Sequence, residues 1–427
     1  MKKLRFYVII NALRLSRMTA DFRNPKQKRI KQMKKMFKIK NIAVSLLALA
    51  VLAGCGTKPA DAETTADTSS VTESAEAAPK LEIADNAIDF AASLKLGWNL
   101  GNTLDATGAS GIRAEISWGQ PVTTKEMIQL VKDSGFTSIR IPVSWGRHTD
   151  ADFTIEAEWF DRVNEVVDYA VDCGLYVIIN SHHDCEQQYY YPTEECYDNS
   201  EKYIKAIWSQ IAERFKDYDE RLVFEAMNEP RLKGTDKEWW FDENDAQGIE
   251  SINCIVKLNQ VFVDTVRAAG GKNETRYLMV PSNAASPANA LNKAFTMPND
   301  PQNRTMLSVH AYTPYNFAMN AGGYKVWKSG RDGEIKDFMD SLNEKFIKNG
   351  YAVVIGEFGA TNKDNPEDRA AWAENYTTLA AGYGMPCFIW DNSGTNVGAE
   401  NFGLLDRKNL TVYFPELLEA YLKGYSK

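Results

Sequence analysis

The sequence contains few histidines and lacks the motifs that commit a chain to a metal or a nucleotide. Only 4 of its 427 residues are histidine, and no HExxH motif occurs. No glycine-rich phosphate loop follows the first predicted strand, which argues against a dinucleotide site. We therefore expect chemistry without a metal and without a cofactor.

The 6 cysteines do not have the pattern of a disulfide framework. Cys55 lies in a leader-like segment, and the five that remain are odd in number and widely spaced. Cys173 and Cys387 fall in apolar runs, so we expect them to be small buried side chains. Cys185 and Cys196 flank one loop, and the sequence leaves open whether they form a disulfide.

The leader-like apolar run is too short to span a bilayer comfortably. It reads IAVSLLALAVLAG at 42–54, follows the basic stretch KKMFKIKN at 34–41, and ends in LAGC at 52–55. This order is typical of a secretory signal peptide. LAGC resembles a bacterial lipobox, which implies cleavage before Cys55 and lipid on its thiol. We expect an extracytoplasmic protein anchored to the cell membrane or cell surface, with an uncleaved short anchor as the alternative.

Composition divides the chain into four parts. We interpret residues 1–35 as an upstream extension or part of the leader, and 34–54 as the lipoprotein signal peptide. Residues 55–80 are rich in Thr, Ser, Ala and Glu without an aromatic residue, which predicts a disordered tether. Residues 81–427 show no second linker and no repeat, which indicates one folded catalytic domain.

Charge is distributed unevenly. Residues 1–41 hold 14 Lys and Arg against one acid, whereas the remaining chain holds 35 basic and 56 acidic side chains. A body with that excess of acid repels nucleic acid and anionic lipid surfaces, so nucleic-acid binding is not expected. A neutral or cationic partner fits better, and we expect a monomer.

Short apolar runs alternate with amphipathic stretches along the domain. The runs predict strands at 94–100, 138–143, 175–180, 222–227, 276–281, 306–312, 352–358 and 386–390. Helices are predicted between them, including 159–174, 200–218 and 334–350; only the fifth-to-sixth connection lacks a clear one. Eight strand–helix units predict an α/β fold, a (β/α)₈ barrel, with a doubly wound open sheet as the alternative.

Polar and aromatic residues gather where these strands end, which is where barrel enzymes place their chemistry. The strand in LVFEAMNEPR at 222–231 runs directly into Asn228 and Glu229. Two further strands carry His310 and Glu357 near their ends. Three of the four histidines fall at strand ends, which turns alone do not explain.

Seven segments in order resemble glycoside hydrolase family five, and most closely its bacterial endoglucanases, the subfamily of cellulases and xyloglucanases. They are GWNLGNTLDA (97–106), IRIPVSW (139–145), NSHHD (180–184), MNEP (227–230), VHAYTPYNFA (309–318), IGEFGA (355–360) and IWDN (389–392). The resemblance implies retaining hydrolysis of β-linked glycans, with Glu229 as acid/base and Glu357 as nucleophile. The supporting residues it implies are Arg140, His182, Asn228, His310, Tyr312 and Trp390.

The residue types suit this chemistry. Retaining cleavage needs a protonated carboxyl and an ionised one about 5–5.5 Å apart, so we expect the pKa of Glu229 to be raised. Arg140 lies inside an apolar strand. Because successive side chains of a strand point to opposite faces, we expect Arg140 to point into the barrel, where Glu357 is the natural partner for its charge. Tyr312 is placed to donate to Glu357, and Asn228 to hold the sugar 2-hydroxyl. A structural ion pair for Arg140 and a core position for His310 are the alternatives.

Aromatic residues near strand ends offer flat faces for sugar rings. Trp390 is the expected platform under the cleaved residue, and Trp118 is expected to contact the substrate. Trp98 and Trp145 sit at or just after strand ends. Core or loop packing is at least as good an interpretation for the loop residues Trp239, Trp240 and Tyr189, Tyr190 and Tyr191.

Four further polar residues complete the predicted site. Two adjacent histidines on a strand point to opposite faces and rarely bind one ion together, so we expect His182 and His183 to bond sugar or order the carboxylates. Asn102 is expected to bond sugar hydroxyls, and Asp105 either to do so or to serve a turn.

We conclude that the sequence predicts an endo-acting β-1,4-glucanase acting on cellulose, xyloglucan or mixed-linkage glucan, in polymer or oligosaccharide form. The alternatives are a surface glycan-binding lipoprotein without catalysis, and a different reaction, such as β-mannan hydrolysis, on the same barrel.

Overall fold

The computed structural model describes residues 84–328 and 330–426. The predicted extension, signal peptide and tether, with the lipidation site Cys55, lie outside the described residues. The first described element is helix α3, Ala87–Leu94, a few residues after the predicted start of the domain at residue 81.

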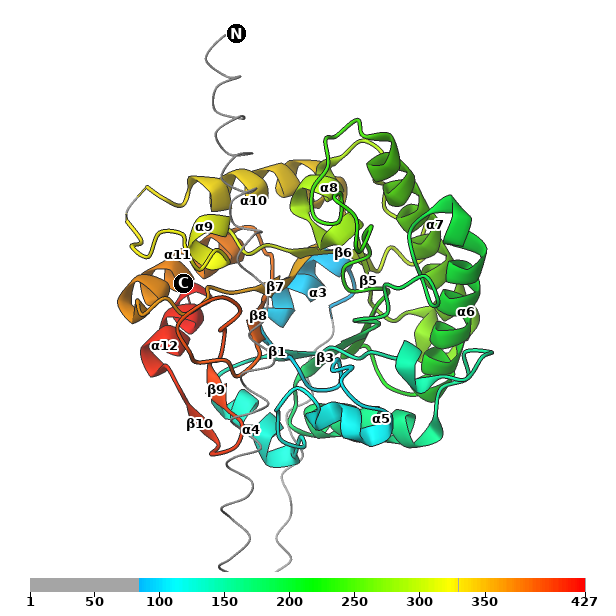
Figure 1. Ribbon diagram of the computed structural model, residues 1–427, viewed down its shortest axis with the longest axis horizontal. Coiled ribbons are helices and arrows are strands. Elements are labelled where there is room, and N and C mark those ends of the chain that lie inside the picture. Colours follow the sequence, from blue (N-terminus) through cyan, green and yellow to red (C-terminus); the bar gives the residue numbers. More distant parts are fainter. Residues whose placement is uncertain (1–83, 329, 427) are drawn as a thin grey trace, which may run out of the picture. The chain divides into compact units, whose positions relative to one another are not determined.

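Eight parallel strands close into a barrel in chain order (Figure 1). They are β1 Leu96–Leu100, β2 Ser138–Ile141, β3 Tyr176–Asn180, β4 Leu222–Glu225, β5 Leu278–Pro281, β6 Thr305–His310, β7 Val353–Phe358 and β8 Cys387–Asp391. Every bound lies close to its prediction. The (β/α)₈ barrel is confirmed, and the open-sheet alternative is wrong because β8 pairs with β1.

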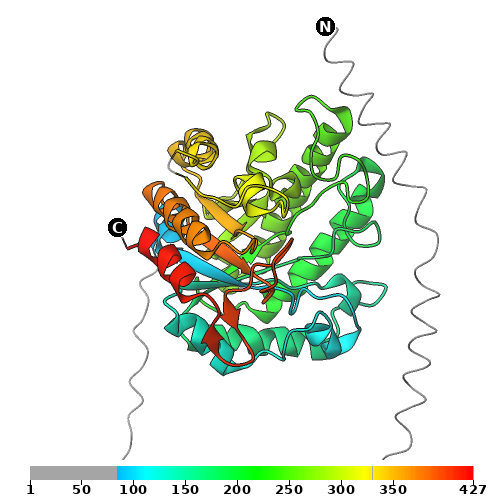
Figure 2. The ribbon, with the colours of Figure 1, turned by 60° about the vertical axis from the view of Figure 1, so that its left-hand side comes forward.

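Helices surround the barrel on its outside (Figures 1 and 2). They are α4 Lys125–Asp133, α5 Ala157–Asp172, α6 Tyr197–Arg214, α7 Ala246–Ala268, α8 Pro287–Leu291, α10 Gly333–Lys345, α11 Pro366–Gly382 and α12 Pro415–Gly424. The three helices predicted by range are confirmed. The short α8 lies in the fifth-to-sixth connection, where no clear helix was predicted.

Local sequence explains where these helices run. The buried face of α5 carries Trp159, Val163, Val166 and Ala170 at intervals of three or four residues, so one stripe packs against the barrel. Gly174, which follows α5, has a φ of 72°, a left-handed conformation that glycine adopts without strain. A glycine in this conformation ends the helix and lets the chain turn toward the next strand.

The half of the barrel interior nearest the amino ends of the strands is filled by large apolar side chains and closed by α3. Phe90 of α3 stacks on Tyr277 with ring centroids 3.7 Å apart and meets Tyr176 edge-on at 5.6 Å. Gly97 on β1 gives Phe388 room, because a Cβ at residue 97 would fall 2.2 Å from that ring. The polar side chains are thereby confined to the other half of the interior.

A small hairpin follows β8. Its strands β9, Leu405–Asp406, and β10, Thr411–Val412, pair antiparallel. The buried Arg407 between them donates to the carbonyl of Gly101 at 2.8 Å and to Thr103 at 2.9 Å. The hairpin is thus bonded to the loop after β1.

All five cysteines of the described part of the chain are free thiols, so Cys185 and Cys196 are not joined. The Cys185 thiol instead donates to the carbonyl of Arg231 at 3.3 Å. Cys387 is fully buried as predicted. Cys173 is only half-buried, because it caps the end of α5 rather than continuing its buried stripe. Among residues 84–328 and 330–426, no helix has the length and apolarity needed to cross a membrane.

Candidate active site

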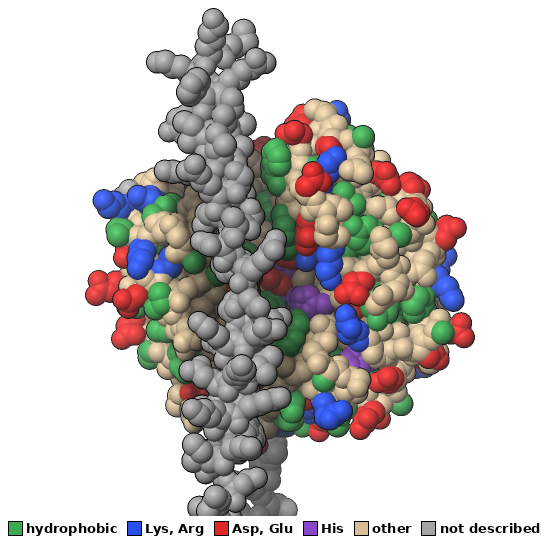
Figure 3. Space-filling view, viewed as in Figure 1, with side chains coloured by type: hydrophobic (Ala, Val, Ile, Leu, Met, Phe, Trp, Pro, Cys, Tyr) green, Lys and Arg blue, Asp and Glu red, His purple; other side chains and the backbone are tan. Residues whose placement is uncertain are grey.

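The inward-facing side chains become polar toward the carboxyl ends of the strands. Along one face of a strand, the two-residue period leads from a small or apolar residue to a polar or aromatic one. The pairs are Gly97 and Asn99, Ser138 and Arg140, Ile178 and Asn180, Val223 and Glu225, Met306 and Ser308, and Phe388 and Trp390. In the view of Figure 3, histidine side chains lie near the middle of the face, with charged side chains around them.

Arg140 on β2 is the centre of this polar layer and is completely buried. Its Nε donates to Glu225 at 2.7 Å, and its Nη1 donates to Glu357 at 2.8 Å. Nη1 also donates to Asn99 at 2.9 Å, and Nη2 donates to Asn228 at 2.7 Å. The prediction that Arg140 faces the interior and pairs with Glu357 is confirmed.

Glu225 is a functional residue that the sequence reasoning missed. It is fully buried and accepts hydrogen bonds from Arg140, from Asn180 at 3.0 Å and from Ser308 at 2.6 Å. Two carboxylates therefore share one guanidinium. The sequence did contain a signal for Glu225. A lone carboxylate inside the apolar run LVFEAM needs a buried partner, as Arg140 does, because an unpaired buried charge is costly.

Glu357 on β7 is held from two sides. Arg140 reaches one carboxylate oxygen, and the Tyr312 hydroxyl donates to the other at 2.9 Å. The Cα atoms of Glu357 and His310 are partners across β6 and β7, at a register shift next to His310. Such irregularities re-aim side chains beside active sites. The predicted Tyr312 contact is confirmed.

Glu229 lies in the loop after β4 and hydrogen-bonds the Nδ1 atom of His310 at 2.8 Å. Burial alone would raise the pKa of Glu229, but the hydrogen bond and charge of His310, with the charge of Arg231, bring it below its ordinary value. Burial alone would lower the pKa of His310, but Glu357 and Glu229 raise it above 6.5. The predicted raised pKa of Glu229 is therefore wrong for the free protein, because a histidinium neighbour outweighs burial.

The two catalytic candidates stand close together. One carboxylate oxygen of Glu229 and one of Glu357 lie within 4.8 Å of each other, with His310 between them. His310 Nδ1 is also 3.7 Å from Glu357. A separation of at most 4.8 Å is nearer to the about 5–5.5 Å of retaining carboxylate pairs than to the about 6.5–9.5 Å of inverting pairs.

Fixed amides determine which atoms point at a substrate. Asn180 accepts from the amide of Val143 through Oδ1, so its Nδ2 must donate to Glu225 and to His182 Nδ1 at 3.1 Å. Burial and nearby positive charges hold the pKa of His182 well below 6.5, so the ring is neutral. Its proton then sits on Nε2, 4.0 Å from Glu357.

The same logic orients Asn228. A guanidinium can only donate, so the amide oxygen of Asn228 faces Arg140. The Nδ2 group is consequently the one turned away from Arg140, which is the donor that a sugar hydroxyl would meet.

His183 follows His182 in the chain, but its side chain is half-buried whereas that of His182 is buried. Its Nε2 is 3.5 Å from Asp105, and its ring centroid is 5.4 Å from that of Trp118. Asp105 is fully buried and accepts from the amide of Thr103 at 2.7 Å, so its turn interpretation is confirmed. His183 and Trp118 are both solvent-accessible, which suits contact with a ligand.

Two groups of described residues could each offer three ligand atoms to a metal ion. They are Asp105 with His182 and His183, and Glu229 with His310 and Glu357. In the second group the Arg140 guanidinium, 2.8 Å from Glu357, disfavours an added cation. Metal-free chemistry stays a prediction.

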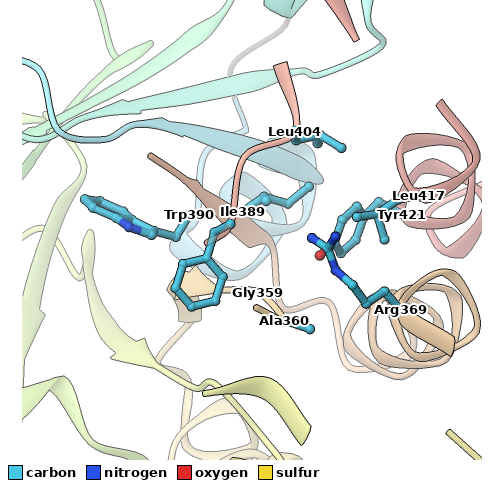
Figure 4. Close-up of a pocket in the computed structure, with 9 residues that line it drawn as sticks. Gly359, Ala360, Arg369, Ile389, Trp390, Leu404, Leu417 and Tyr421 are labelled. Carbon is cyan, nitrogen blue, oxygen red and sulfur yellow. The ribbon is translucent and has the colours of Figure 1, made fainter. Parts of the chain in front are cut away.

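Trp390 of β8 points away from the apolar layer behind it (Figure 4). Ile389 points the opposite way, toward Leu417 and Tyr421 of α12. The Trp390 ring lies parallel to that of His182, with centroids 5.6 Å apart. The expected platform residue is thus half-buried, with a ring anchored at the site.

The other aromatic candidates separate by exposure. Trp98 and Trp145 are buried, and their indole N–H groups donate to Asp391 and to the carbonyl of Asn180, so both are structural. Trp239 and Trp240 are 57% and 70% exposed. The three consecutive tyrosines also divide, because 190 and 191 are buried and 189 is half-buried. Asn102 is half-buried beside the site with a φ of 59°, and its sugar contact stays a prediction.

Comparison with known proteins gives consistent matches. The family model Cellulase (glycosyl hydrolase family 5) matches residues 101–396. Endoglucanase A of Ruminococcus albus is 44% identical over 346 residues, which cover 79% of this chain and 93% of that protein. Cellulase/esterase CelE of Acetivibrio thermocellus is 42% identical over 343 residues; the match covers 79% of this chain but only 40% of that longer protein.

A solved structure agrees with these matches. A mutant lichenase of glycoside hydrolase family 5 from Caldicellulosiruptor sp. F32, in complex with cellotetraose, is 45% identical with a TM-score of 0.77. The superposition covers 82% of this chain and 99% of that one.

Proposed function

This chain belongs to the cellulase family, glycosyl hydrolase family 5, and from that premise we propose the part that each residue plays in its reaction. The protein is an endo-β-1,4-glucanase that hydrolyses β-glucan backbones with retention through two glutamates. We assign Glu357 as the nucleophile and Glu229 as the general acid and base.

The observation that carries this assignment is the different environment of the two carboxylates. Glu357 is held by Arg140 and Tyr312, which donate to its two carboxylate oxygens and fix their positions. Glu229 instead shares a hydrogen bond with His310, a group that can hold and return a proton. One carboxylate is therefore fixed for attack, and the other is connected to a proton.

In the first step an oxygen of Glu357 attacks the anomeric carbon, and the bond from that carbon to the leaving oxygen breaks. Because the pKa of Glu229 is lowered in the free enzyme and that of His310 raised, the pair holds its one proton on His310. As the leaving oxygen gains negative charge, the proton passes through Glu229 to that oxygen.

In the second step water attacks the same carbon, the bond to Glu357 breaks, and Glu229 accepts the proton that water loses. Glycosylation removes the negative charge of Glu357, which is the group that contributes most to raising the pKa of His310. The site thereby loses affinity for a proton when it must provide a base.

The remaining polar groups bind the sugar. Asn228 offers Nδ2 to the 2-hydroxyl, a contact that strengthens in the transition state. His182 offers its Nε2–H next to Glu357, and Trp390 offers a flat face to the sugar that is cleaved.

The roles of the two glutamates can be distinguished by testing their alanine variants on substrates with different leaving groups. Glu229→Ala should lose more than a hundred-fold in kcat on β-glucan but retain partial hydrolysis of dinitrophenyl cellobioside, which needs no acid. Azide should restore its turnover by attacking where the base is missing. Glu357→Ala should lose activity on both substrates, and azide should not restore hydrolysis.

Glu243→Ala is the matched control, because Glu243 is an exposed carboxylate of the same loop. It should behave as the wild type. If Glu229→Ala lost activity equally on both substrates and azide had no effect, the acid/base assignment would be overturned.

We also propose that the mature protein is a monomer anchored to a bacterial membrane through lipid on Cys55. The lipobox-like LAGC supports this, and a diacylglyceryl group supplies the two acyl chains that stable anchoring requires. A tether of about 25 residues would then reach on the order of 25–30 Å from the membrane.

Labelled palmitate tests the anchor. The wild-type chain expressed in a bacterium should incorporate label and sediment with membranes, and Cys55→Ala should incorporate none. A wild-type protein free of label in the medium would contradict lipid anchoring without affecting the assignment of the glutamates.

A further inference from the structure

Asp105, in the loop after β1, has one carboxylate oxygen that the fold does not use. Its Oδ1 accepts from the amide of Thr103 at 2.7 Å. Its Oδ2 is buried and has no hydrogen-bond partner, the only carboxylate oxygen of which this holds among residues 84–328 and 330–426. The buried guanidinium of Arg407 lies nearby, but it donates to other groups. Because a buried carboxylate oxygen without a donor is costly, Oδ2 favours a positively charged ligand.

His183 faces this oxygen. Its Nε2 is 3.5 Å from Asp105 Oδ2, but the two atoms do not form a hydrogen bond. Ligand atoms held at about 2.0–2.2 Å around a tetrahedral Zn²⁺ ion lie about 3.4 Å from one another. The two atoms are therefore separated as two ligands of one metal ion would be.

A single serine holds both residues in place. The Ser144 hydroxyl donates to the carbonyl of Asp105 at 2.8 Å and accepts from the amide of His183 at 3.2 Å. Ser144 is fully buried, and its own amide donates to the carbonyl of Leu104 at 3.0 Å. Hydrogen bonds that fix ligand residues strengthen metal binding, and here they position the pair before an ion arrives.

His182 borders this pair but is a poor third ligand. One of its ring nitrogens lies within 4.8 Å of the ligand atoms of Asp105 and His183. Its Nδ1, however, accepts from Asn180, so its Nε2 carries the proton. A histidine binds a metal through a nitrogen that carries no proton. We therefore expect water, and not His182, to complete the ligand shell.

The combination of nitrogen and oxygen selects the kind of ion. Imidazole binds Zn²⁺ and Cu²⁺ well, whereas Mg²⁺ and Ca²⁺ prefer oxygen ligands alone. Solvent reaches the pair, because the His183 side chain is 36% exposed. Trp118, whose ring centroid is 5.4 Å from that of His183, is exposed as well. A hydrated transition-metal ion can therefore enter from solvent.

We propose that Asp105 and His183 bind one Zn²⁺ or Cu²⁺ ion and that this ion inhibits the enzyme. His182 connects the metal site to the nucleophile, because its ring centroid is 4.5 Å from that of His183 and its Nε2 is 4.0 Å from Glu357. The ion would bring its charge and its water molecules to the edge of the place where the sugar must lie, so ion and glucan compete. The inhibition rests on the proposed function, whereas binding of the ion does not.

Calorimetric titration of the full chain with zinc chloride, after removal of bound metal with EDTA, measures binding without activity. We expect one ion per chain. His183→Ala and Asp105→Asn should each weaken binding more than about ten-fold, because even groups outside the ligand shell affect metal affinity about 10–100-fold. The asparagine keeps Oδ1 as the acceptor for Thr103, so the fold should persist, which circular dichroism checks.

Three control variants test the other groups that zinc could contact. His310→Gln removes a ligand from the second candidate group, which contains both glutamates. Cys173→Ser and Cys196→Ser remove the two half-buried thiols. Each of these variants should bind zinc as the wild type does.

Hydrolysis gives a second readout. Zinc should raise the apparent KM for β-glucan several-fold without lowering kcat, because ion and glucan compete, and EDTA should reverse the effect. In His183→Ala the effect should be absent when each rate is compared with the rate of the same variant without metal. Mg²⁺ or Ca²⁺ at the same concentration should not inhibit the wild type.

Contrary results have distinct meanings. Zinc binding that is unchanged in both His183→Ala and Asp105→Asn would overturn the metal site. Binding that is lost in His310→Gln instead would place the ion between the catalytic glutamates, which also overturns it. Zinc bound at His183 with unchanged hydrolysis would overturn the inhibition. Failure of the glutamate variants to lose activity would remove the proposed function, and it would not alter the calorimetric result.

Discussion

At the scale of single residues, the proton for cleavage is shared between Glu229 and His310. The 2.8 Å contact lowers the pKa of Glu229, and the charge of Glu357 together with that contact raises the pKa of His310. The pair keeps its proton until the pH rises through the pKa of His310, which lies above 6.5. The alkaline limit of activity should therefore report the imidazole and not a carboxyl group.

His310→Gln tests this sharing. Without the imidazole the proton must reside on Glu229 alone, and a carboxyl group loses its proton at lower pH than a stabilised imidazolium. The alkaline limb of the kcat/KM profile should move to lower pH by about one unit, and the acid limb should move less. A limb that stays in place while kcat falls would mean that His310 only positions Glu229.

Arg140 and Glu225 form the buried ion pair beneath the catalytic pair. In Glu225→Gln the guanidinium loses a charged partner inside the barrel, which costs about 3–5 kcal/mol in unfolding free energy. Because the same guanidinium holds Asn228 and Glu357, kcat should also fall more than ten-fold. Urea unfolding and steady-state kinetics measure the two effects.

Asp300→Asn is the matched control for that variant. Asp300 is also buried and pairs with Arg267, at 2.8 Å, but it lies before β6 and away from the site. It should lower stability while leaving kcat unchanged. If both variants reduced kcat alike, the effect of Glu225 would be one of stability only.

The sequence predicted the site residue by residue where spacing and residue type were enough. The two-residue period placed Arg140 inside the barrel and Tyr312 against Glu357, and both contacts exist. The pKa of Glu229 was mispredicted because it depends on how close His310 comes, a distance that sequence spacing does not give. Glu225 was missed because the strand was predicted to run to residue 227, which placed this glutamate inside an apolar run, whereas it is the last residue of β4.

At the scale of elements, the strands were predictable because each is a short apolar run between amphipathic stretches. Helix α3 and the β9–β10 hairpin were not, since each is short and takes its position from tertiary contacts. Phe90 of α3 illustrates this, because its partners Tyr176 and Tyr277 belong to distant strands. Local pattern alone cannot show that a helix closes a barrel.

Phe90→Ala measures the contribution of α3. Removing a fully buried ring that stacks on Tyr277 should cost about 3–5 kcal/mol of unfolding free energy. The polar layer with Arg140 lies beyond the apolar one, so kcat below the melting temperature should not change. Calorimetry and kinetics check the two parts; a large loss of kcat in folded protein would show that α3 affects the site.

At the scale of the whole molecule, the barrel delivers side chains from several strands to one end and leaves recognition of the polymer to loops. Trp118, Trp239 and Trp240 are exposed on such loops. We expect a chain to be bound across this end and cut internally.

Viscosity gives the measurement. For carboxymethyl cellulose or xyloglucan, viscosity should fall well before reducing ends accumulate, because one internal cut halves a chain. Release of cellobiose with viscosity maintained would contradict internal cutting. Tyr351→Ala, which removes an exposed aromatic residue before β7 at the opposite end of the barrel, serves as a control that should leave the ratio unchanged.

The long sequence distances inside the polar layer bear on how the enzyme is made. Arg140 emerges from the ribosome 85 residues ahead of Glu225 and 217 ahead of Glu357. The barrel closes only when Asp391 of β8 accepts the hydrogen bond of Trp98, synthesised 293 residues earlier. Until residue 357 has been synthesised, Arg140 lacks at least one of its two carboxylate partners. Catalytic power therefore arises in a single late event during biosynthesis, and an interrupted translation product that lacks β8 cannot cut glucan at all.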